Sequence, residues 1–326
     1  MTAPVRRGLL IPAWLLSVIA LLWFLRTARE LLIPIAVSIL VSYAVEPVVA
    51  RLVRARVPRA LGAALVLLLL TGLFAWGLYA LRDEVAELLA ALPATAARLS
   101  AWAGVGGDPM AEAGGAGVIL RGIGWLLTGA GNVTIVVLLS YFLLLSGDHF
   151  KRRVVETAGR SDRMRVTADV FDDINDQIQR FLLVQVFTSM VVAVATWLVL
   201  WWMAVPQAAV WAIAAGLFNS IPYFGPVIVS GGLFVVGMVQ SGDPATAARM
   251  AGATLLITSL EGWLLNPVLM GKAERMHVVV VFVGVLLWTW LWGAWGTILA
   301  VPMMVVVKAV CDHVEPLRPI SRLLAR

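Results

Sequence analysis

The sequence predicts an all-α, polytopic membrane protein. Of its 326 residues, 61% are hydrophobic and 13% are charged, whereas about 25% of the residues in a soluble domain are charged. Apolar runs long enough to cross a hydrocarbon core of about 30 Å recur along the chain. Because these runs are continuous instead of alternating in polarity, they favour helices over a β-barrel.

Eight hydrophobic segments follow one another, and two of them are each interrupted by one acid. Their ranges are 9–25, 31–50, 61–81, 122–147, 181–206, 207–242, 250–271 and 277–307. We expect six full spans and two re-entrant or broken helical hairpins, the latter in 207–242 and 277–307. Charged residues follow the first segment in place of a cleavage site, so we interpret it as a retained span.

The arginines indicate how the chain is oriented. They gather in the loop 51–59, in 148–180 and in the tail 313–326. Positive residues are retained in the cytoplasm, so we expect both termini there. The charge of +6 then reflects orientation and not nucleic-acid binding. We also expect Glu46 to pair with an arginine of the loop, and Pro47 to end the second span.

These assignments divide the chain into six regions. The first three are 1–81, which contains spans 1–3; 82–121, an extracytoplasmic segment with an amphipathic helix over 83–100 and a Gly- and Ala-rich linker; and 122–147, the fourth span. The region 148–180 is a charged cytoplasmic helical segment that continues into the fifth span. The region 181–312 contains the fifth span, the span 250–271 and both hairpins, and 313–326 is a cytoplasmic tail.

Two runs are too long for single straight helices. The run 207–242 has no charged residue and would be about 54 Å long as one helix. Pro222 and Pro226, with Gly225 between them, stop the helix near its middle. Exposed backbone at membrane depth is tolerated only inside protein or against a water-filled cavity, so we expect a cavity there. In 277–307, Gly293 and Gly296 permit a tight turn.

Glu261 is the sharpest single candidate, because an acid within a span costs at least about 2.5–3.5 kcal/mol. One interpretation is a carboxylate that couples protons or cations to transport. The other is a carboxylate that hydrogen-bonds a broken backbone and fixes the bend at Asn266 and Pro267. Asn219 and Tyr223 could donate hydrogen bonds to a polar solute, although Tyr223 could equally anchor a hairpin tip at the membrane interface.

Several classes of protein are excluded by what the sequence lacks. The single cysteine, Cys311, excludes an internal disulfide and a thiolate metal site. The phosphate-loop motif, the H-E-x-x-H motif and the G-x-S-x-G motif are absent, so neither nucleotide hydrolysis nor membrane proteolysis is expected. We therefore predict no enzyme activity, no catalytic residues, no metal site and no cofactor.

Three motifs together resemble one family. Asn219-Ser-Ile-Pro-Tyr-Phe-Gly-Pro226 resembles its I-P-Y-x-G-P signature, and Leu260-Glu-Gly-Trp-Leu-Leu-Asn-Pro267 with Gly271 resembles its E-x-x-x-x-x-P-x-x-x-G segment. The stretch from Trp292 to Pro302 resembles its closing G-x-x-G-x-x-x-A-x-P. With early matches at Leu32-Ile-Pro34, Glu46-Pro47 and Val57-Pro58-Arg59, about residues 9–310 resemble the autoinducer-2 exporter family, also called PerM-like permeases.

The resemblance implies a multi-pass permease of the bacterial inner membrane, with export-type activity and a homo-oligomeric assembly. It also implies an elevator-like movement of the hairpin-bearing part, and sodium–proton antiport in some members. This chain departs from the family at His277-Val278, where a proline is common. The expected partners are the lipid bilayer, a small-molecule or ion substrate and other copies of the chain, with no nucleic acid.

The leading functional hypothesis is a secondary transporter that moves a small polar solute, with a signalling molecule as one candidate, across the bacterial inner membrane by alternating access. It is driven by the solute's own gradient or by protons or sodium, with Glu261 as the coupling-ion residue. The substrate-binding candidates are Asn219, Pro222, Tyr223, Gly225, Pro226, Asn266, Pro267, Gly293 and Gly296. The alternatives are an ion channel, a sodium–proton antiporter, or a non-transporting membrane scaffold acting through 148–180.

Overall fold

The structure is a computed structural model that describes residues 4–103, 133–146, 161–221, 224–270 and 277–313. The regular secondary structure in these ranges is helical throughout, which confirms the all-α class. Within them, three helices are long and apolar enough to cross a membrane by length and composition: Arg29–Arg54, Arg59–Glu87 and Asn175–Trp202.

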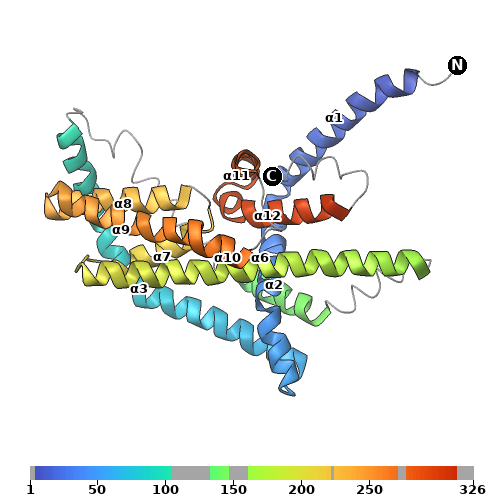
Figure 1. Cartoon of the computed structure of the whole chain (residues 1–326), viewed down its shortest axis with the longest axis horizontal. Coiled ribbons are helices and arrows are strands. Elements are labelled where there is room, and N and C mark those ends of the chain that lie inside the picture. The colour runs from blue at the N-terminus through green and yellow to red at the C-terminus, as the bar shows by residue number, and fades with distance from the viewer. Residues whose placement is uncertain (1–3, 104–132, 147–160, 222–223, 271–276, 314–326) are drawn as a thin grey trace.

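The chain begins with three long helices, α1 (Pro4–Thr27), α2 (Arg29–Arg54) and α3 (Arg59–Ala103). Helix α1 projects away from the body of the molecule (Figure 1). Helix α3 runs without a break from the third hydrophobic segment through the predicted amphipathic helix 83–100. Helix α2 continues through Pro47 to Arg54, so Pro47 does not end the helix, and the end of the second span at Glu46 and Pro47 stays a prediction. A proline inside a membrane helix is tolerated where neighbouring groups satisfy the freed backbone.

A further apolar helix, Val133–Ser146, packs beside α2. The Ser140 hydroxyl donates to the carbonyl of Ser38 at 3.2 Å. The Ser38 hydroxyl lies 2.6 Å from the carbonyl of Pro34, on its own helix, and 3.3 Å from that of Val136. The two buried hydroxyl groups thus hydrogen-bond across the interface of the two helices, as serine and threonine side chains do between membrane helices.

Arg59, the first residue of α3, joins three helices at the end of α2. Its Nη2 atom donates to Glu46 Oε1 on α2 at 2.8 Å. Its Nε atom donates at 2.8 Å to the carbonyl of Leu144, which lies in the last turn of the helix Val133–Ser146. The predicted pairing of Glu46 with an arginine of the loop 51–59 is therefore present.

Helix α6 (Ser161–Trp202) is the central element of the fold. Its 42 residues make a rod about 63 Å long, which joins the charged residues from 161 onward to the fifth hydrophobic segment. Figure 1 shows α7, α8 and α9 gathered along one half of α6 and α12 near the other half. The helix ends where Ala204 adopts a left-handed φ of 54° and the Val205 N–H bonds the Leu200 carbonyl at 2.9 Å.

The run 207–242 forms two helices, α7 (Ala208–Phe218) and α8 (Phe224–Ser241). Gly225 lies against the carbonyl of Phe218, and Gly232 lies against the ring of Trp211. A step of seven residues forward along α8 thus matches a step of seven residues back along α7. The two helices are therefore antiparallel, with their break at residues 219–223.

The run 277–307 forms α11 (Val278–Trp292) and α12 (Ala294–His313). Gly293 separates them with a φ of 63°, a left-handed conformation that glycine adopts without a steric penalty. Gly296 lies against the carbonyl of Trp288, and Gly284 lies against the side chain of Met304. These contacts make α11 and α12 a second antiparallel pair, and α12 continues through Pro302.

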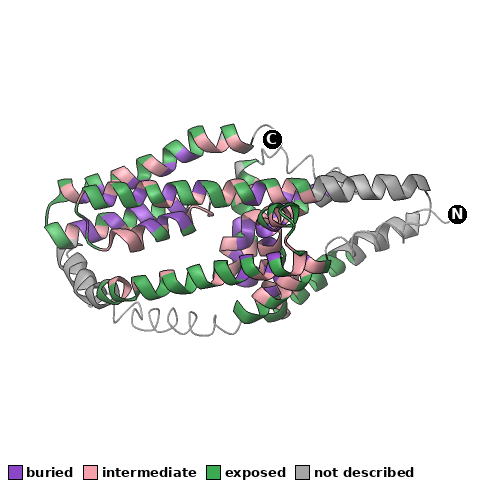
Figure 2. Cartoon of the chain, turned by 90° about the horizontal axis from the view of Figure 1, so that it is seen from below, coloured by how far each residue is buried: buried purple, intermediate pink, exposed green. Residues whose placement is uncertain are grey.

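Between the two hairpins lie α9 (Pro244–Leu260), a π-helical turn η1 (Glu261–Leu265) and the short α10 (Asn266–Met270). The Asp243 carboxylate caps α9 by accepting hydrogen bonds from the backbone N–H groups of Ala245 and Thr246. Burial concentrates where these helices meet, and the outward faces stay exposed (Figure 2), as expected of a surface that faces lipid.

Glycines bring the helix backbones close together. A Cβ atom added to Gly216 on α7 would lie 2.9 Å from the carbonyl oxygen of Ser189 on α6, and one added to Gly237 on α8 would lie 2.7 Å from the Cα atom of Ala247 on α9. Small residues at such crossings are typical of membrane helix packing, where close van der Waals contact drives association.

This packing predicts that Gly237→Ala destabilises the protein, whereas Gly231→Ala on the same helix does not. The added methyl group at 237 must push α8 away from α9, while a Cβ atom at Gly231 meets no atom within 4 Å. Overpacking costs about 1–3 kcal/mol, so the melting temperature of Gly237→Ala in detergent should fall by several degrees. Equal melting temperatures for the two variants would contradict this packing.

Candidate functional site

Glu261 stands at the start of the π-helical turn and is 8% exposed. The Asn266 N–H donates to the carbonyl of Glu261, five residues earlier in the chain, whereas in an α-helix the acceptor lies four residues earlier. Pro267 follows directly, and it has no N–H to continue an α-helical ladder. Single π turns inside α-helices occur frequently at functional sites, and this one presents a buried carboxylate.

Two polar side chains from other helices face the Glu261 carboxylate. Thr188 of α6 and Asn219, at the end of α7, lie close enough to donate hydrogen bonds to it. The Oε1 atom of the carboxylate has no hydrogen-bond partner. The structure thus brings together two residues that the sequence singled out, Asn219 and Glu261, and adds Thr188, which the sequence analysis did not identify.

A row of buried hydroxyl groups leads to Glu261 along α9. Thr254, Thr258 and Glu261 follow one another at intervals of four and three residues, and all three are buried. The two threonine hydroxyls bond carbonyls of their own helix, Met250 and Thr254, at 3.3 and 3.1 Å. The spacing is visible in the sequence, and it is the signal that would have found them.

The break between α7 and α8 is a tight turn. The Ile221 N–H bonds the Phe218 carbonyl at 2.8 Å, and the Gly225 N–H bonds the Ile221 carbonyl at 3.0 Å. No side chain fits at Gly225, because a Cβ atom there would collide with the Phe218 carbonyl. Pro226 lies in the first turn of α8, and its carbonyl accepts the Ser230 hydroxyl at 2.6 Å.

The other candidates near the break are placed less completely. Pro222 and Tyr223 lie outside the described residues, so the cavity predicted at these two residues stays a prediction. Asn266 begins α10, and its Oδ1 atom is buried without a hydrogen-bond partner. Pro267 follows within α10. Glu261, at the start of the π turn, and Asn266, directly after it, therefore each have one buried oxygen without a hydrogen-bond partner.

Gly293 and Gly296 lie at the tip of the second hairpin, next to α1. Beside this tip, the Trp292 Nε1 atom donates to the Leu25 carbonyl at 3.0 Å, and the Arg26 guanidinium lies 4.7 Å from the ring centroid of Trp290. The structure therefore places this tip against the end of α1.

The first hairpin meets the second at another point on α11. Phe224, the first residue of α8, stacks on Phe282, with their ring centroids 5.6 Å apart. Because Phe282 and Trp292 are separated by ten residues of α11, these two contacts lie about 15 Å apart along its axis. The structure does not bring Gly293 and Gly296 to the contact made by Phe224.

An apolar groove lies on another face of the molecule, between α2 and the helix Val133–Ser146. Its volume is about 370 Å³, and Glu30 is the one charged residue among those that line it. No three histidine, cysteine, aspartate or glutamate side chains gather to hold a metal within the part of the chain that the structure describes.

These features define an integral membrane protein built from helical hairpins, with a buried carboxylate between them. The chain belongs to the AI-2E transporter family, because the model of that family, described as "AI-2E family transporter", matches residues 9–106 and 114–315. The chain is thus a member of a family of membrane transporters.

Curated bacterial relatives match along most of their length. The chain is 25% identical to the AI-2 transport protein TqsA of Escherichia coli, with 98% of this chain and 96% of that protein covered. It is 28% identical to the putative permease PerM of the same species, with 86% of each covered. It is 26% identical to the putative transport protein YrrI of Bacillus subtilis, with 93% of each covered.

The site predicts opposite effects of removing two acids. Glu261→Gln should raise the melting temperature of the purified protein, because a buried carboxylate is costly in a membrane protein and an amide occupies the same space without charge. Glu46→Gln should lower it, because the ion pair of Glu46 with Arg59 is lost, at a cost of up to about 1 kcal/mol. Thermal unfolding in detergent measures both, and a fall for Glu261→Gln would show that the carboxylate is a net structural support.

Proposed function

We propose that this protein is a secondary transporter that moves a small polar solute across the bacterial inner membrane by alternating access. The observation that carries the proposal is the buried Glu261 carboxylate, which faces Asn219 at the break of the first hairpin. Discontinuous helices with polar groups at the break form the substrate and coupling-ion sites of many carriers. Both termini are proposed to lie in the cytoplasm, and the assembly is proposed to be a homo-oligomer.

The proposed solute site lies around the break of the first hairpin. Asn219, Gly225 and Pro226 line the turn in the structure, and Pro222 and Tyr223 complete the motif in the sequence. Asn266 and Pro267, directly after the π turn, are proposed to complete the site, where the Asn266 Oδ1 atom can accept a hydrogen bond from a solute hydroxyl or amine. Gly293 and Gly296 are proposed to serve as the hinge of the second hairpin, whose tip adjoins α1.

Glu261 is proposed to couple transport to protons or sodium. Its neighbours suit both states of the carboxyl group. The Thr188 hydroxyl and the Asn219 amide each contain a donor and an acceptor, so each can donate to the carboxylate or accept from the carboxylic acid. In the structure the Thr188 hydroxyl donates to the Gln185 carbonyl at 3.2 Å, so it keeps an acceptor when Glu261 carries a proton.

The relatives support a signalling molecule as one class of solute, because one of them is named an AI-2 transport protein. The antiparallel arrangement within each hairpin supports two elements that can each enter and leave the membrane on one side. A channel is the second candidate function, because hairpins with broken tips also build pores. Currents through single molecules in a planar bilayer would favour the channel and exclude a carrier cycle.

We expect Glu261→Gln to abolish ion-driven flux in reconstituted vesicles while leaving exchange of solute down its own gradient. The amide keeps the shape and hydrogen bonds of the site but cannot take up a proton or offer a negative charge to sodium. Glu30→Gln, at an exposed acid on α2, is the matched control and should transport like the wild type. Flux that remains ion-driven in Glu261→Gln would exclude coupling through this residue.

A further inference from the structure

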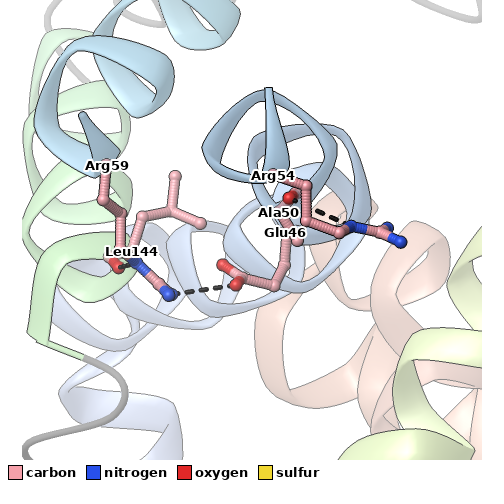
Figure 3. A network of polar contacts seen from close by, with 5 residues as sticks. All are labelled: Glu46, Ala50, Arg54, Arg59 and Leu144. Atoms are coloured by element: carbon pink, nitrogen blue, oxygen red, sulfur yellow. Dashed lines mark hydrogen bonds and ion pairs between the residues drawn. The ribbon is translucent and has the colours of Figure 1, made fainter. Parts of the chain in front are cut away.

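Four arginines lie close together at the turn between α2 and α3, and one carboxylate lies near them. Between residues 31 and 82 the sequence contains Glu46 as its single acid. The structure pairs that acid with Arg59 at 2.8 Å. Figure 3 shows Arg59 and Glu46 pointing toward each other, whereas the guanidinium of Arg54 points away from them.

Arg51, Arg54 and Arg56 remain exposed beside this pair. Arg54 donates to the Ala50 carbonyl at 3.4 Å, and within the described residues none of the three forms an ion pair. Within the part of the chain that the structure describes, no acid compensates these three positive charges at the end of a membrane helix, so this surface is complementary to an anion.

The backbone at Arg56 adds a second, independent observation. Arg56 adopts a left-handed φ of 68° as the residue after the C-cap Ala55 of α2. The Arg56 N–H bonds the Val53 carbonyl at 3.0 Å, and the Val57 N–H bonds the Leu52 carbonyl at 3.1 Å. Glycine is usually found at this position of such a helix end. An arginine there adopts a backbone conformation that is less favourable for it than for glycine.

An apolar stripe begins immediately beyond these charges. Leu61, Leu65, Leu68 and Leu69 of α3 are each between 59% and 69% exposed. Their spacing of four, seven and eight residues from the first places them on one face of α3. Because α3 is long and apolar enough to span a membrane, this face is directed at lipid chains.

We propose that the α2–α3 turn binds an anionic phospholipid. The phosphate contacts the guanidinium groups of Arg51, Arg54 and Arg56, and an acyl chain lies along the leucine stripe of α3. Clusters of basic residues at the end of a membrane helix bind anionic lipid headgroups. The pair of Glu46 with Arg59 removes the nearby negative charge that would otherwise repel the phosphate.

The test uses the full chain purified in detergent and stripped of lipid, with phosphatidylglycerol added and the bound lipid counted by native mass spectrometry. The variant Arg51→Gln/Arg54→Gln/Arg56→Gln should bind phosphatidylglycerol on the order of 100-fold more weakly than the wild type, since each arginine contributes about a fivefold gain. The control Arg29→Gln/Arg82→Gln/Arg249→Gln removes the same charge elsewhere and should bind within about threefold of the wild type.

A single variant separates lipid binding from folding. Arg56→Gly relieves the left-handed backbone, so its melting temperature should equal or exceed that of the wild type. Its affinity for phosphatidylglycerol should nevertheless fall about fivefold. If Arg56→Gly binds phosphatidylglycerol more weakly while its melting temperature is not lowered, partial unfolding is excluded as the cause of the weaker binding.

Four outcomes would overturn the proposal. The first is that the triple variant and the wild type bind phosphatidylglycerol equally well, and the second is that the wild type binds phosphatidylcholine as well as phosphatidylglycerol. The third is that the wild type binds the soluble headgroup glycerophosphoglycerol equally well, which would show a phosphate site without a lipid site. The fourth is that the triple variant loses its oligomers but keeps its lipid binding, which would assign the arginines to another copy of the chain.

Discussion

The structure depends on one constraint, that backbone N–H and C=O groups at membrane depth must find partners inside the protein. Helices meet this requirement along most of the chain. At the break between α7 and α8, the N–H groups of Ile221 and Gly225 turn back to carbonyls of the hairpin itself. At the second hairpin the change of direction is confined to Gly293, which keeps the exposed backbone short.

The same constraint explains the π turn. Pro267 removes one donor from the helix, and the turn from Glu261 to Leu265 shifts the ladder so that Asn266 bonds the Glu261 carbonyl. This shift sets Glu261 against Asn219 and Thr188 from two other helices. A polar group is thus held at a point where the backbone is already irregular, and the two irregular segments meet.

Local chemistry made part of this arrangement predictable. Prolines and glycines indicated the break in 207–242 and the turn at Gly293, because each acts on its own neighbours. A charged residue in an apolar run singled out Glu261 for the same reason. Glu46 could be assigned an arginine partner from the loop 51–59 because the two lie close together in the sequence.

Long-range partners were not predictable in this way. Thr188 reaches Glu261, and Leu144 reaches Arg59, through the packing of helices that are far apart in the chain, and one sequence contains no record of which faces meet. The contact of Trp292 with the Leu25 carbonyl has the same origin. The continuation of α2 through Pro47 to Arg54 also depends on packing, because proline on its own weakens a helix interior.

The unbroken course of α6 has a mechanical consequence. Its 42 residues form a rod about twice as long as the hydrocarbon core is thick. Thr188 sits partway along this rod, beside α7 and the π turn. A stiff rod moves as a lever, so a tilt imposed at its charged end displaces the residues beside Glu261 in proportion. A displacement of that end would therefore reach Thr188, and its neighbour Glu261, through the helix itself.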